Sequence, residues 1–592
     1  MAGFSLKRKN RDVPNSAAQK NIRRQNVIML IYSILIIILL NIIGSFVFTR
    51  FDLTAEKRYT LSDVTKKMLS QVDDYVYFKI YLEGDFPAGF KRLRNETREM
   101  LDEFRAYNEF IGYEFINPNV SSDEKERDNT YRLLIEKGLK PTELNVKAKE
   151  GSKQQIIFPG AMVSYKGRET SMHLLLEQLG SSSETVLNNS IQNLEFNLAT
   201  AVNKLIINDK PKIAFITGHG ELNDKDNYSA REALSEYYSV EKVQLNGKIN
   251  ALTERNTSDS SRVGIYNKYT AIIIAKPDSA FSEKDKFIID QFLMRGGKIL
   301  WLVDGVNAEM DSLQKKSSTL GLANEINIED QLFKYGVRIN PDLILDVTCL
   351  PIVMITGRNG DQPKFGYLPW MFFPLLNPTS KHPIVNNLNG IRTQFTSSID
   401  TIGIKNVKKT ILLSSSQYSR SVSAPVIIDL EMVKRQPDER LFTQANIPVA
   451  VLLEGKFESL FKNRVPAEIR EDRQISFVEN SRQTQVIVVS DGDVIRNQTH
   501  RQKGYPLPLG FDQDTRQSFG NGDFILNAMN YLVDDSRLIS IRSRELKIRL
   551  LDRKRVEAEK LQWQILNIGL PILLVIFFAL LWNFFRKRRY TR

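Results

Sequence analysis

Residues Val27–Phe48 read VIMLIYSILIIILLNIIGSFVF and contain no charged side chain. Sixteen of these 22 residues are Ile, Leu, Val or Phe. A helix rises about 1.5 Å per residue, so a helix of this length crosses the ~30 Å hydrocarbon core of a bilayer. The stretch is longer than the apolar core of a signal peptide, and it ends in Phe-Thr-Arg-Phe rather than in small residues. We therefore expect an uncleaved membrane anchor.

A second apolar stretch lies near the other end of the chain. Residues Ile565–Phe585 read ILNIGLPILLVIFFALLWNFF. The segment between the two stretches is about 515 residues long, which exceeds the ~250–300 residues at which a single core stops growing. The sequence therefore predicts at least two domains held between two anchors in one membrane.

The positive charge of the chain is concentrated in its two tails. Of the net charge of +13, residues 1–26 carry +6 and residues 586–592 carry +5, which leaves +2 for everything between. Basic tails beside apolar stretches suit anionic lipid headgroups. A nearly neutral middle does not suit nucleic acid, so we expect no nucleic-acid partner.

The basic residues also bear on the orientation of the anchors. Two spans place both tails on one side, and the Arg586-Lys587-Arg588-Arg589 cluster favours the cytoplasmic side. The body between the spans is then expected outside the cytoplasm. The reverse orientation stays open, because five basic residues also follow the first span closely. Cys349 is the only cysteine, so no internal disulfide identifies the compartment.

The pattern after the first anchor predicts a small α/β domain over residues 49–182. Ser62 is a plausible helix N-cap, and the following segments alternate between helix and strand periodicity in the order βαβαββ. That order resembles a thioredoxin-like domain. The absence of a Cys-x-x-Cys motif excludes thioredoxin-type redox chemistry.

Residues 183–537 predict a larger α/β domain. A long helix, Glu184–Ile207, precedes the strand Lys212–Thr217, and helices then alternate with apolar strands such as AIIIA at Ala271–Ala275. This alternation is typical of a mostly parallel sheet covered on both faces, with a flavodoxin- or amidotransferase-like arrangement. Ser282 is expected to cap a helix, and Asp311–Ser318 is expected to be a loop. Whether residues 306–480 form a separate domain stays open.

We therefore divide the chain into seven parts. They are a basic cytoplasmic tail (residues 1–26), a first span (27–48), the two α/β domains (49–182 and 183–537), a charged juxtamembrane helix (538–564), a second span (565–585) and a second basic cytoplasmic tail (586–592).

Gly218-His219-Gly220-Glu221 directly follows a predicted strand, where open α/β sheets place ligand sites. His219 and Glu221 could act as base and orienting group. The alternative is a tight turn that needs the backbone freedom of Gly218 and Gly220. No Cys or Ser nucleophile follows a strand here, so we favour the structural role.

Three carboxylates, Asp304, Asp491 and Asp493, also follow predicted strands. They could bind a metal ion if their oxygens converged. Loop capping is the more common role for such residues, and no histidine with metal-ligand spacing accompanies them. Cys349 is expected to be a small buried residue. We expect no metal and no cofactor.

Partner or membrane contacts are expected at two places. The segment FGYLPWMFFPLL at Phe365–Leu376, with Trp370, Phe372 and Phe373, is either an exposed apolar surface or an irregular segment buried in its own core. In the apolar stretches, Asn41, Asn567 and Pro571 are expected to face other helices, since polar groups facing lipid are costly.

Three motifs occur in a fixed order: DLTAEKRYTLSDVT after the first anchor, KPKIAFITGHGE after the long helix, and LISIRSRELKIRLLD before the second anchor. Together they resemble the gliding-motility-associated ABC transporter auxiliary proteins of the GldG family. The resemblance implies a bacterial inner-membrane protein with a periplasmic body, a separate polytopic permease and a cytoplasmic ATPase. It also implies a link to gliding motility or type IX secretion.

The sequence thus predicts a non-catalytic subunit of an ABC-type membrane complex. The chain contains no Gly-x-x-x-x-Gly-Lys-Ser/Thr motif, so it is not itself expected to be the ATPase. Two alternatives stay open: a membrane-tethered hydrolase or amidotransferase that uses His219 and Glu221, and a solute-binding receptor for the permease.

Overall fold

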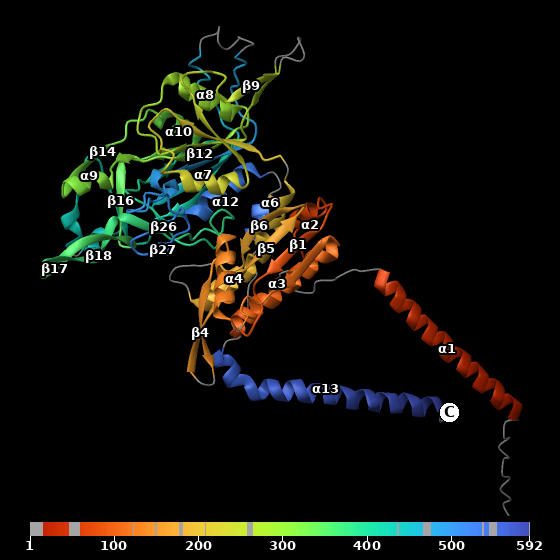
Figure 1. Cartoon of the computed structure of the whole chain (residues 1–592). Helices are drawn as coiled ribbons and strands as arrows, with labels where there is room; N and C mark the ends of the chain where they lie inside the picture. Colours follow the sequence, from red (N-terminus) through yellow and green to blue (C-terminus); the bar gives the residue numbers. More distant parts are fainter. Residues whose placement is uncertain are drawn as a thin grey trace, which may run out of the picture. The chain divides into compact units, whose positions relative to one another are not determined.

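The computed structural model describes residues 16–46, 60–121, 123–148, 151–176, 182–207, 209–256, 264–434, 437–465, 475–534, 538–543 and 553–590. Contacts divide the chain into two compact units, Met1–Thr60 and Leu61–Arg592. Helix α1 (Ser16–Phe46) belongs to the first unit, and every later element belongs to the second (Figure 1).

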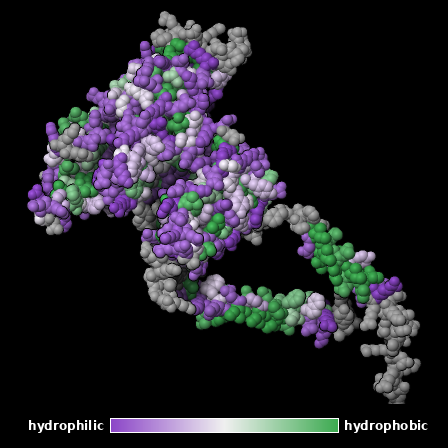
Figure 2. Space-filling model, in the orientation of Figure 1, coloured by the Kyte–Doolittle hydropathy of each residue, from purple (hydrophilic) through white to green (hydrophobic). Residues whose placement is uncertain are grey.

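Helix α1 and helix α13 (Arg553–Tyr590) are each long and apolar enough to cross a membrane. Their apolar stretches, Arg24–Ile42 and Val556–Arg588, are not buried in the protein. Figure 2 shows both helices as largely hydrophobic, whereas the visible face of the rest of the protein is mostly hydrophilic. Side chains of this kind are stable only against another apolar phase, such as lipid or a partner helix.

A four-stranded sheet with the order β2-β1-β5-β6 follows α1 in the chain. Strands β1 and β2 are parallel, and β5 is antiparallel to both β1 and β6. The burial of β1 alternates residue by residue, so Val76, Phe78 and Ile80 face the core. The bounds are β1 (Val76–Ile80), β2 (Ile111–Phe115), β5 (Gly160–Tyr165) and β6 (Arg168–His173).

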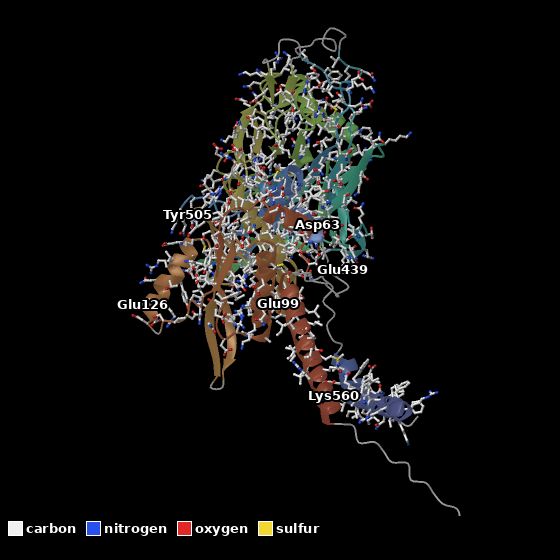
Figure 3. The ribbon with its side chains drawn as sticks, turned by 90° about the vertical axis from the view of Figure 1, so that its right-hand side faces the viewer. Asp63, Glu99, Glu126, Glu439, Tyr505 and Lys560 are labelled. Atoms are coloured by element: carbon white, nitrogen blue, oxygen red, sulfur yellow. The ribbon has the colours of Figure 1, made fainter. Side chains whose placement is uncertain are left out.

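Helices α2 (Asp63–Leu69), α3 (Ala88–Tyr107), α5 (Ser183–Gln192) and α6 (Leu194–Ile206) share one hydrophobic core with this sheet. Ser62 accepts a hydrogen bond from the Thr65 N–H and caps α2, as the sequence predicted. Helix α4 (Glu124–Glu136) packs on a separate small cluster and turns Glu126 outward (Figure 3). A hairpin of β3 (Thr142–Ala148) and β4 (Gly151–Ile157) follows α4.

A seven-stranded sheet with the order β21-β24-β25-β12-β11-β7-β8 forms the larger part of the body, by which we mean residues 61–543. The neighbours from β25 to β8 are parallel, and β24 is antiparallel to both β25 and β21. The bounds are β7 (Lys212–Thr217), β8 (Ser239–Gln244), β11 (Ala271–Ala275), β12 (Lys298–Leu302), β21 (Val407–Ser414), β24 (Pro448–Gly455) and β25 (Thr484–Val489).

Helices cover both faces of the seven-stranded sheet, as the alternation of helix and strand predicted. On one face α7 (Tyr228–Ser235) and α12 (Asn521–Val533) pack on Ile273 and its neighbours. On the other face α8 (Glu283–Met294) and α10 (Glu329–Tyr335) pack on Ile272 and Ile274. Every residue of AIIIA is therefore buried. Ser282 caps α8 by accepting a hydrogen bond from the Asp285 N–H.

Between β12 and β25 the chain builds smaller sheets around a core that contains Trp370. Two strands of the same stretch, β21 and β24, return to the seven-stranded sheet, so residues 306–480 both elaborate that sheet and form a core of their own. The smaller elements are β13 (Val306–Asn307), α9 (Met310–Lys315), β14 (Ser318–Ala323), β15 (Val337–Ile339), β16 (Asp342–Asp346), β17 (Cys349–Asn359), β18 (Gln362–Leu376), β19 (Ile391–Arg392), β20 (Ile399–Thr401), β22 (Ser419–Ser423) and β23 (Val426–Asp429).

The remaining short elements are two strand pairs and four 3₁₀ turns. They are β9 (Thr253–Asn256) with β10 (Gly264–Asn267), β26 (Phe511–Asp512) with β27 (Gln517–Ser518), and η1 (Leu430–Lys434), η2 (Glu439–Leu441), η3 (Gly492–Ile495) and η4 (Leu538–Ser543).

Four local expectations differ from the structure. The expected helix Glu184–Ile207 is two helices that meet at Asn193, whose ψ of 2° interrupts the first. Both pack in the hydrophobic core of the four-stranded sheet, which we call the first core. The expected loop Asp311–Ser318 contains α9, and the expected irregular segment Phe365–Leu376 is part of strand β18.

The fourth difference concerns the expected juxtamembrane helix at residues 538–564. Its first residues form the 3₁₀ turn η4, because Leu538, Ile539 and Ile541 pack in the first core. Helix α13 is described over Arg553–Tyr590, which includes the second half of the expected helix, and residues 544–552 lie outside the described residues.

Candidate functional site

The carboxyl ends of the five parallel strands lie at one edge of the seven-stranded sheet. After β7 the chain crosses to β8 on one side, and it then returns to β11 on the other side of β7. Ligands of doubly wound sheets bind in the crevice at such a reversal. A cavity of about 200 Å³ lies here, lined among others by Gly220, Glu221, Lys276, Asp304 and Arg496.

Lys276, the residue directly after β11, is the centre of this edge. Its ammonium nitrogen lies 2.5 Å from Oδ2 of Asp493, 2.8 Å from Oε1 of Glu309 and 3.2 Å from Oδ2 of Asp304. The residue has a left-handed φ of 54°, which is costly for a side chain other than glycine. Gly492 permits the close approach, because a Cβ there would overlap the Lys276 side chain. Three carboxylates therefore surround one buried ammonium group.

Arg496 extends the ion-pair network away from Lys276. It lies 3.2 Å from Glu309, 3.3 Å from Asp493 and 3.4 Å from Asp226. Burial disfavours the charged form of Asp493, but the two cations outweigh burial and lower the pKa of its carboxyl group. The network is thus held together by two bases and four acids from four different loops.

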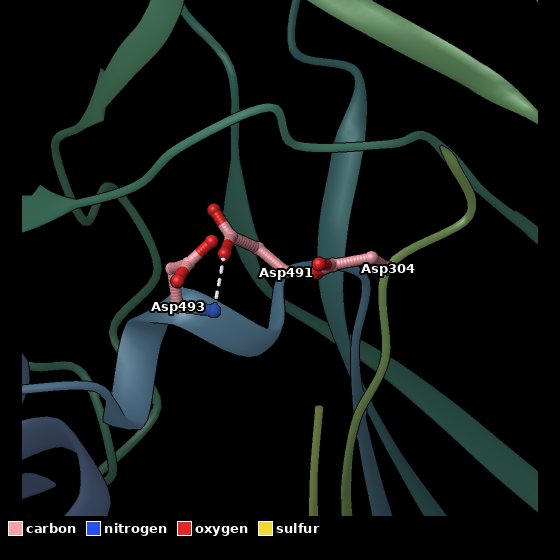
Figure 4. Close-up of side chains that lie close together, drawn as sticks. All are labelled: Asp304, Asp491 and Asp493. Carbon is pink, nitrogen blue, oxygen red and sulfur yellow. Dashed lines mark hydrogen bonds between the residues drawn. The ribbon is translucent and has the colours of Figure 1, made fainter. Parts of the chain in front are cut away.

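The predicted carboxylates Asp304, Asp491 and Asp493 do come together (Figure 4). One oxygen from each lies within 4.8 Å of the others. Burial, with the charges of Asp493 and Asp304, raises the pKa of Asp491 well above its usual range. Burial also raises the pKa of Asp304 to about 6, although Lys276 opposes the shift.

The arrangement fits an internal ion pair better than a divalent cation. The ammonium group of Lys276 already contacts Asp304 and Asp493. Asp491 accepts hydrogen bonds from the Gln394 N–H at 2.8 Å and the Thr396 hydroxyl at 2.7 Å. A metal ion prefers several ionised oxygen ligands that converge on it, and here one carboxyl favours its neutral form while two are paired with lysine.

His219 and Glu221 form a second cluster beside this cavity. Nδ1 of His219 lies 3.2 Å from Glu221 Oε1, and Nε2 lies 3.3 Å from Asp285 Oδ2. The imidazole ring stacks on Phe281 with 3.8 Å between centroids. Burial alone would lower the pKa of His219, but its bonds to the two carboxylates outweigh burial and raise it.

This geometry supports a positioning role for the motif at residues 218–221. Both ring nitrogens of His219 are engaged, and the Glu221 carboxylate also accepts the His219 backbone N–H at 2.7 Å. Gly218 and Gly220 have φ values of 115° and 73°, as a tight turn requires. The cluster ties the loop after β7 to helix α8, which carries Asp285.

The other predicted residues lie elsewhere. Trp370, Phe372 and Phe373 are at most 5% exposed, so their side chains belong to a core, which is the second of the two interpretations of that segment. Cys349 begins β17, and burial raises the pKa of its thiol to about 11.

The polar residues of the two apolar helices are exposed. Asn41 on α1 donates from Nδ2 to the Ile37 carbonyl of its own helix, 3.0 Å away. Asn567 and Pro571 lie on α13, with Pro571 inside the helix.

Sequence reasoning missed the two basic residues of the site. Lys276 directly follows the buried strand AIIIA, so the rule that singled out Asp304 at the end of the next strand could have found it. Arg496 had no such signal, because it follows a 3₁₀ turn rather than a strand.

Comparison with known proteins gives two family matches. Residues 55–164 match a domain of unknown function (DUF7088), and residues 210–528 match a family described as an ABC-type uncharacterized transport system. A Borreliella burgdorferi protein described as uncharacterized is 21% identical over 549 residues, which is 91% of this chain and 94% of that protein. Among solved structures, the chain resembles the N-terminal domain of mmIFT52 at 12% identity and a TM-score of 0.30, over 54% of this chain and 97% of that one.

The second family match covers the seven-stranded sheet, the helices on its faces except the last residues of α12, and the whole ion-pair network around Lys276. It also spans more than half of the chain. The chain therefore belongs to the ABC transporter auxiliary family, described as an ABC-type uncharacterized transport system.

Proposed function

We propose that this chain is a non-catalytic, membrane-anchored subunit of an ABC transporter complex. The observation that carries the proposal is the pair of apolar helices α1 and α13, which lie at opposite ends of the chain and bury none of their apolar stretches. The match to the ABC transporter auxiliary family also supports the proposal. In this proposal the first membrane span, at residues 27–48, includes the second half of α1, and the second span, at residues 565–585, lies within α13.

The proposed orientation places both tails in the cytoplasm and the body in the periplasm. It is supported by the charge distribution, since the tails carry most of the net positive charge and basic residues favour the cytoplasmic side. The proposed complex contains a polytopic permease and a cytoplasmic ATPase as separate chains. Asn41, Asn567 and Pro571 would then face permease helices rather than lipid.

One further element of the proposal, a link to gliding motility or type IX secretion, derives from the resemblance to the GldG family. A second element, the finer fold assignment, derives from the order of the helices and strands. The order β2-β1-β5-β6 supports a thioredoxin-like domain, and the order of β8, β7, β11, β12 and β25 supports a flavodoxin- or amidotransferase-like one.

A non-catalytic role is supported by the state of the candidate catalytic groups. The ring nitrogens of His219 are both bonded to carboxylates, and the charged groups of the neighbouring edge are paired with each other. The hydrolase alternative predicts that His219→Ala and Glu221→Gln abolish function in a stably folded protein. Our proposal predicts loss of function only in proportion to loss of stability.

Recovery of the complex from native membranes tests the partners. We expect an affinity-tagged chain, solubilised in mild detergent, to bring down a permease and an ATPase subunit. Recovery of the chain alone would contradict the proposal.

Thiol labelling of intact cells tests the orientation. The reagent is a maleimide that crosses the outer membrane but not the inner membrane, and the background is Cys349→Ser. It should label Glu126→Cys, since residue 126 is exposed on α4, but it should not label Ser5→Cys in the first tail. The two variants are matched, since each carries one cysteine. Labelling of Ser5→Cys with protection of Glu126→Cys would reverse the orientation.

A further inference from the structure

A second and larger cavity lies within the unit Leu61–Arg592. Its volume is about 610 Å³, which is in the range of sites for small organic ligands, ~300–1,000 Å³. One wall consists of residues of β6 and α6, including His173 and Thr200. Residues of α12 and η4, including Asn530 and Arg542, also line the cavity. We call this cavity the cleft.

Arg542 lines the cleft as a buried cation that forms no ion pair with any residue that the structure describes. The residue is 9% exposed, and its guanidinium group donates from Nη1 to Asn527 Oδ1 at 3.3 Å and from Nη2 to the Asn386 carbonyl at 2.7 Å. It also lies over the ring of Phe196, 5.2 Å from the centroid. Nε has no acceptor. Within the described ranges, no carboxylate lies within ion-pair distance of this side chain.

The other buried basic side chains are paired with carboxylates. Within the described part of the chain, the lysine and arginine residues of 9% exposure or less are Lys276, Lys286 and Arg542. Lys276 contacts three carboxylates, and Lys286 contacts Glu283 at 3.0 Å and Asp330 at 2.7 Å. A buried charge is costly unless it is paired. Arg542 thus lacks the carboxylate that the fold supplies to each of the other two.

Further groups on the cleft wall also suit a negative charge. Lys140 is exposed at the cleft, and Lys204 lies there in an ion pair with Glu236. Thr200 has a buried hydroxyl oxygen without a hydrogen-bond partner. Asp523 is an acid that also lines the cleft, but this residue is exposed. Burial and the charge of Lys140 lower the pKa of His173 to about 4, so the imidazole adds no positive charge at neutral pH.

We propose that the cleft binds a small organic anion. Its acidic group lies against Arg542, since a guanidinium group is well suited to carboxylates and phosphates. Lys140 adds positive charge to the same cavity. Its apolar part packs against Leu388, Leu509 and Leu526, which also line the cleft. This inference goes beyond the proposed role as an auxiliary subunit, and it does not depend on the orientation or partners proposed above.

Calorimetric titration of the full chain in the nonionic detergent dodecyl maltoside tests the charge preference. The probe is 4-phenylbutyrate, and the control is 4-phenylbutylamine, which has a similar shape and the opposite charge. Inorganic phosphate tests whether the acidic group alone suffices. We expect binding of the carboxylate, at least tenfold weaker binding of phosphate and no binding of the amine. Equal binding of the amine, or no binding of any probe up to about 10 mM, would overturn the proposal.

Matched variants locate the binding. Lys140→Glu reverses a charge at the cleft, and Lys364→Glu makes the same change at an exposed lysine on β18, which does not line the cleft. We expect the first to weaken 4-phenylbutyrate binding at least fivefold and the second to leave it unchanged. Equal affinities for the two variants would overturn the proposal.

The role of Arg542 is tested with Arg542→Lys and Arg542→Gln. The lysine variant keeps the charge and should retain part of the binding, whereas the glutamine variant should lose it. Because Arg542 also holds η4 to α12, the glutamine variant could fail to fold, and the surface variant Lys140→Glu then decides the question. Full binding by a folded Arg542→Gln protein would contradict the assignment.

Discussion

The ammonium nitrogen of Lys276 lies 2.5 Å from Oδ2 of Asp493, and this contact spans 217 residues of sequence. Lys276 follows β11 and Asp493 follows β25, with β12 between them in the sheet. The same ammonium group reaches Asp304 at the end of β12. One buried side chain therefore connects the ends of three adjacent strands, and the loops that line the smaller cavity depend on it.

Replacing Lys276 should strongly destabilise the protein. Lys276→Met removes the cation, so that Asp304 stays buried without a counter-charge and Asp493 keeps only Arg496. Breaking a buried ion pair in this way typically costs about 3–5 kcal/mol. Lys364→Met is the matched control, because that lysine is exposed. The free energy of unfolding, measured by urea denaturation of the full chain in detergent, checks the prediction. Equal stability of the two variants would show that the ion pair is not needed for folding.

Gly492→Ala should disturb the same contact from the opposite side. A Cβ at residue 492 would overlap Cβ and Cγ of Lys276, and overpacking of this kind costs about 1–3 kcal/mol. Gly403→Ala is the matched control, since a Cβ there meets nothing within 4 Å. We expect a lower thermal midpoint for Gly492→Ala alone. A midpoint unchanged from the parent protein would mean that the two loops can separate freely.

Strand β18 allows a direct comparison of a buried and an exposed aromatic residue. Trp370 is 1% exposed and Phe365 is 62% exposed. Trp370→Ala should cost about 3–5 kcal/mol of unfolding free energy. Phe365→Ala should change it by less than about 0.5 kcal/mol. Urea denaturation measures both. If Trp370→Ala left stability intact but released a bound partner, the aromatic segment would act as a docking surface instead.

The His219 cluster should make stability depend on pH. Because the folded-state pKa of His219 is raised, its contribution is fully present below the unfolded-state value of about 6.5 and is lost as pH rises through the folded-state value. His219→Gln should therefore reduce the free energy of unfolding more at pH 5 than at pH 9.

His500→Gln serves as the histidine control, because His500 lies on a different loop and has no contact with Glu221 or Asp285 among the described residues. Thermal unfolding of both variants over this pH range provides the comparison. An equal loss of stability at pH 5 and pH 9 for His219→Gln would show that its imidazole does not carry the positive charge in the folded protein.

Much of the architecture was predictable because its signals are local. The fully apolar AIIIA strand, the alternating burial of β1 and the caps at Ser62 and Ser282 each depend on residues a few positions apart. The break at Asn193 was missed because helical periodicity continues on both sides of it. Strand β18 was missed because its prolines and aromatics are unusual in a strand, and pairing with β17 overrides that preference.

The candidate sites were predictable only in part. Position after a strand was enough to single out His219, Asp304, Asp491 and Asp493. It was not enough to assign their protonation state or their hydrogen-bond and ion-pair partners. That state depends on Lys276, on Asp285 and on the extent of burial, which are set by contacts between distant segments.

The sequence by itself determined the two apolar helices, the concentration of positive charge in the tails and the alternation of strands with helices. Each of these depends on composition or on spacing within a few residues. Only the tertiary structure decided that Lys276 is surrounded by carboxylates, that Arg542 has no carboxylate partner among the described residues, and that Trp370 is buried in a core. Burial and ion pairing depend on which distant segments the fold brings together, and no local pattern in the sequence records that.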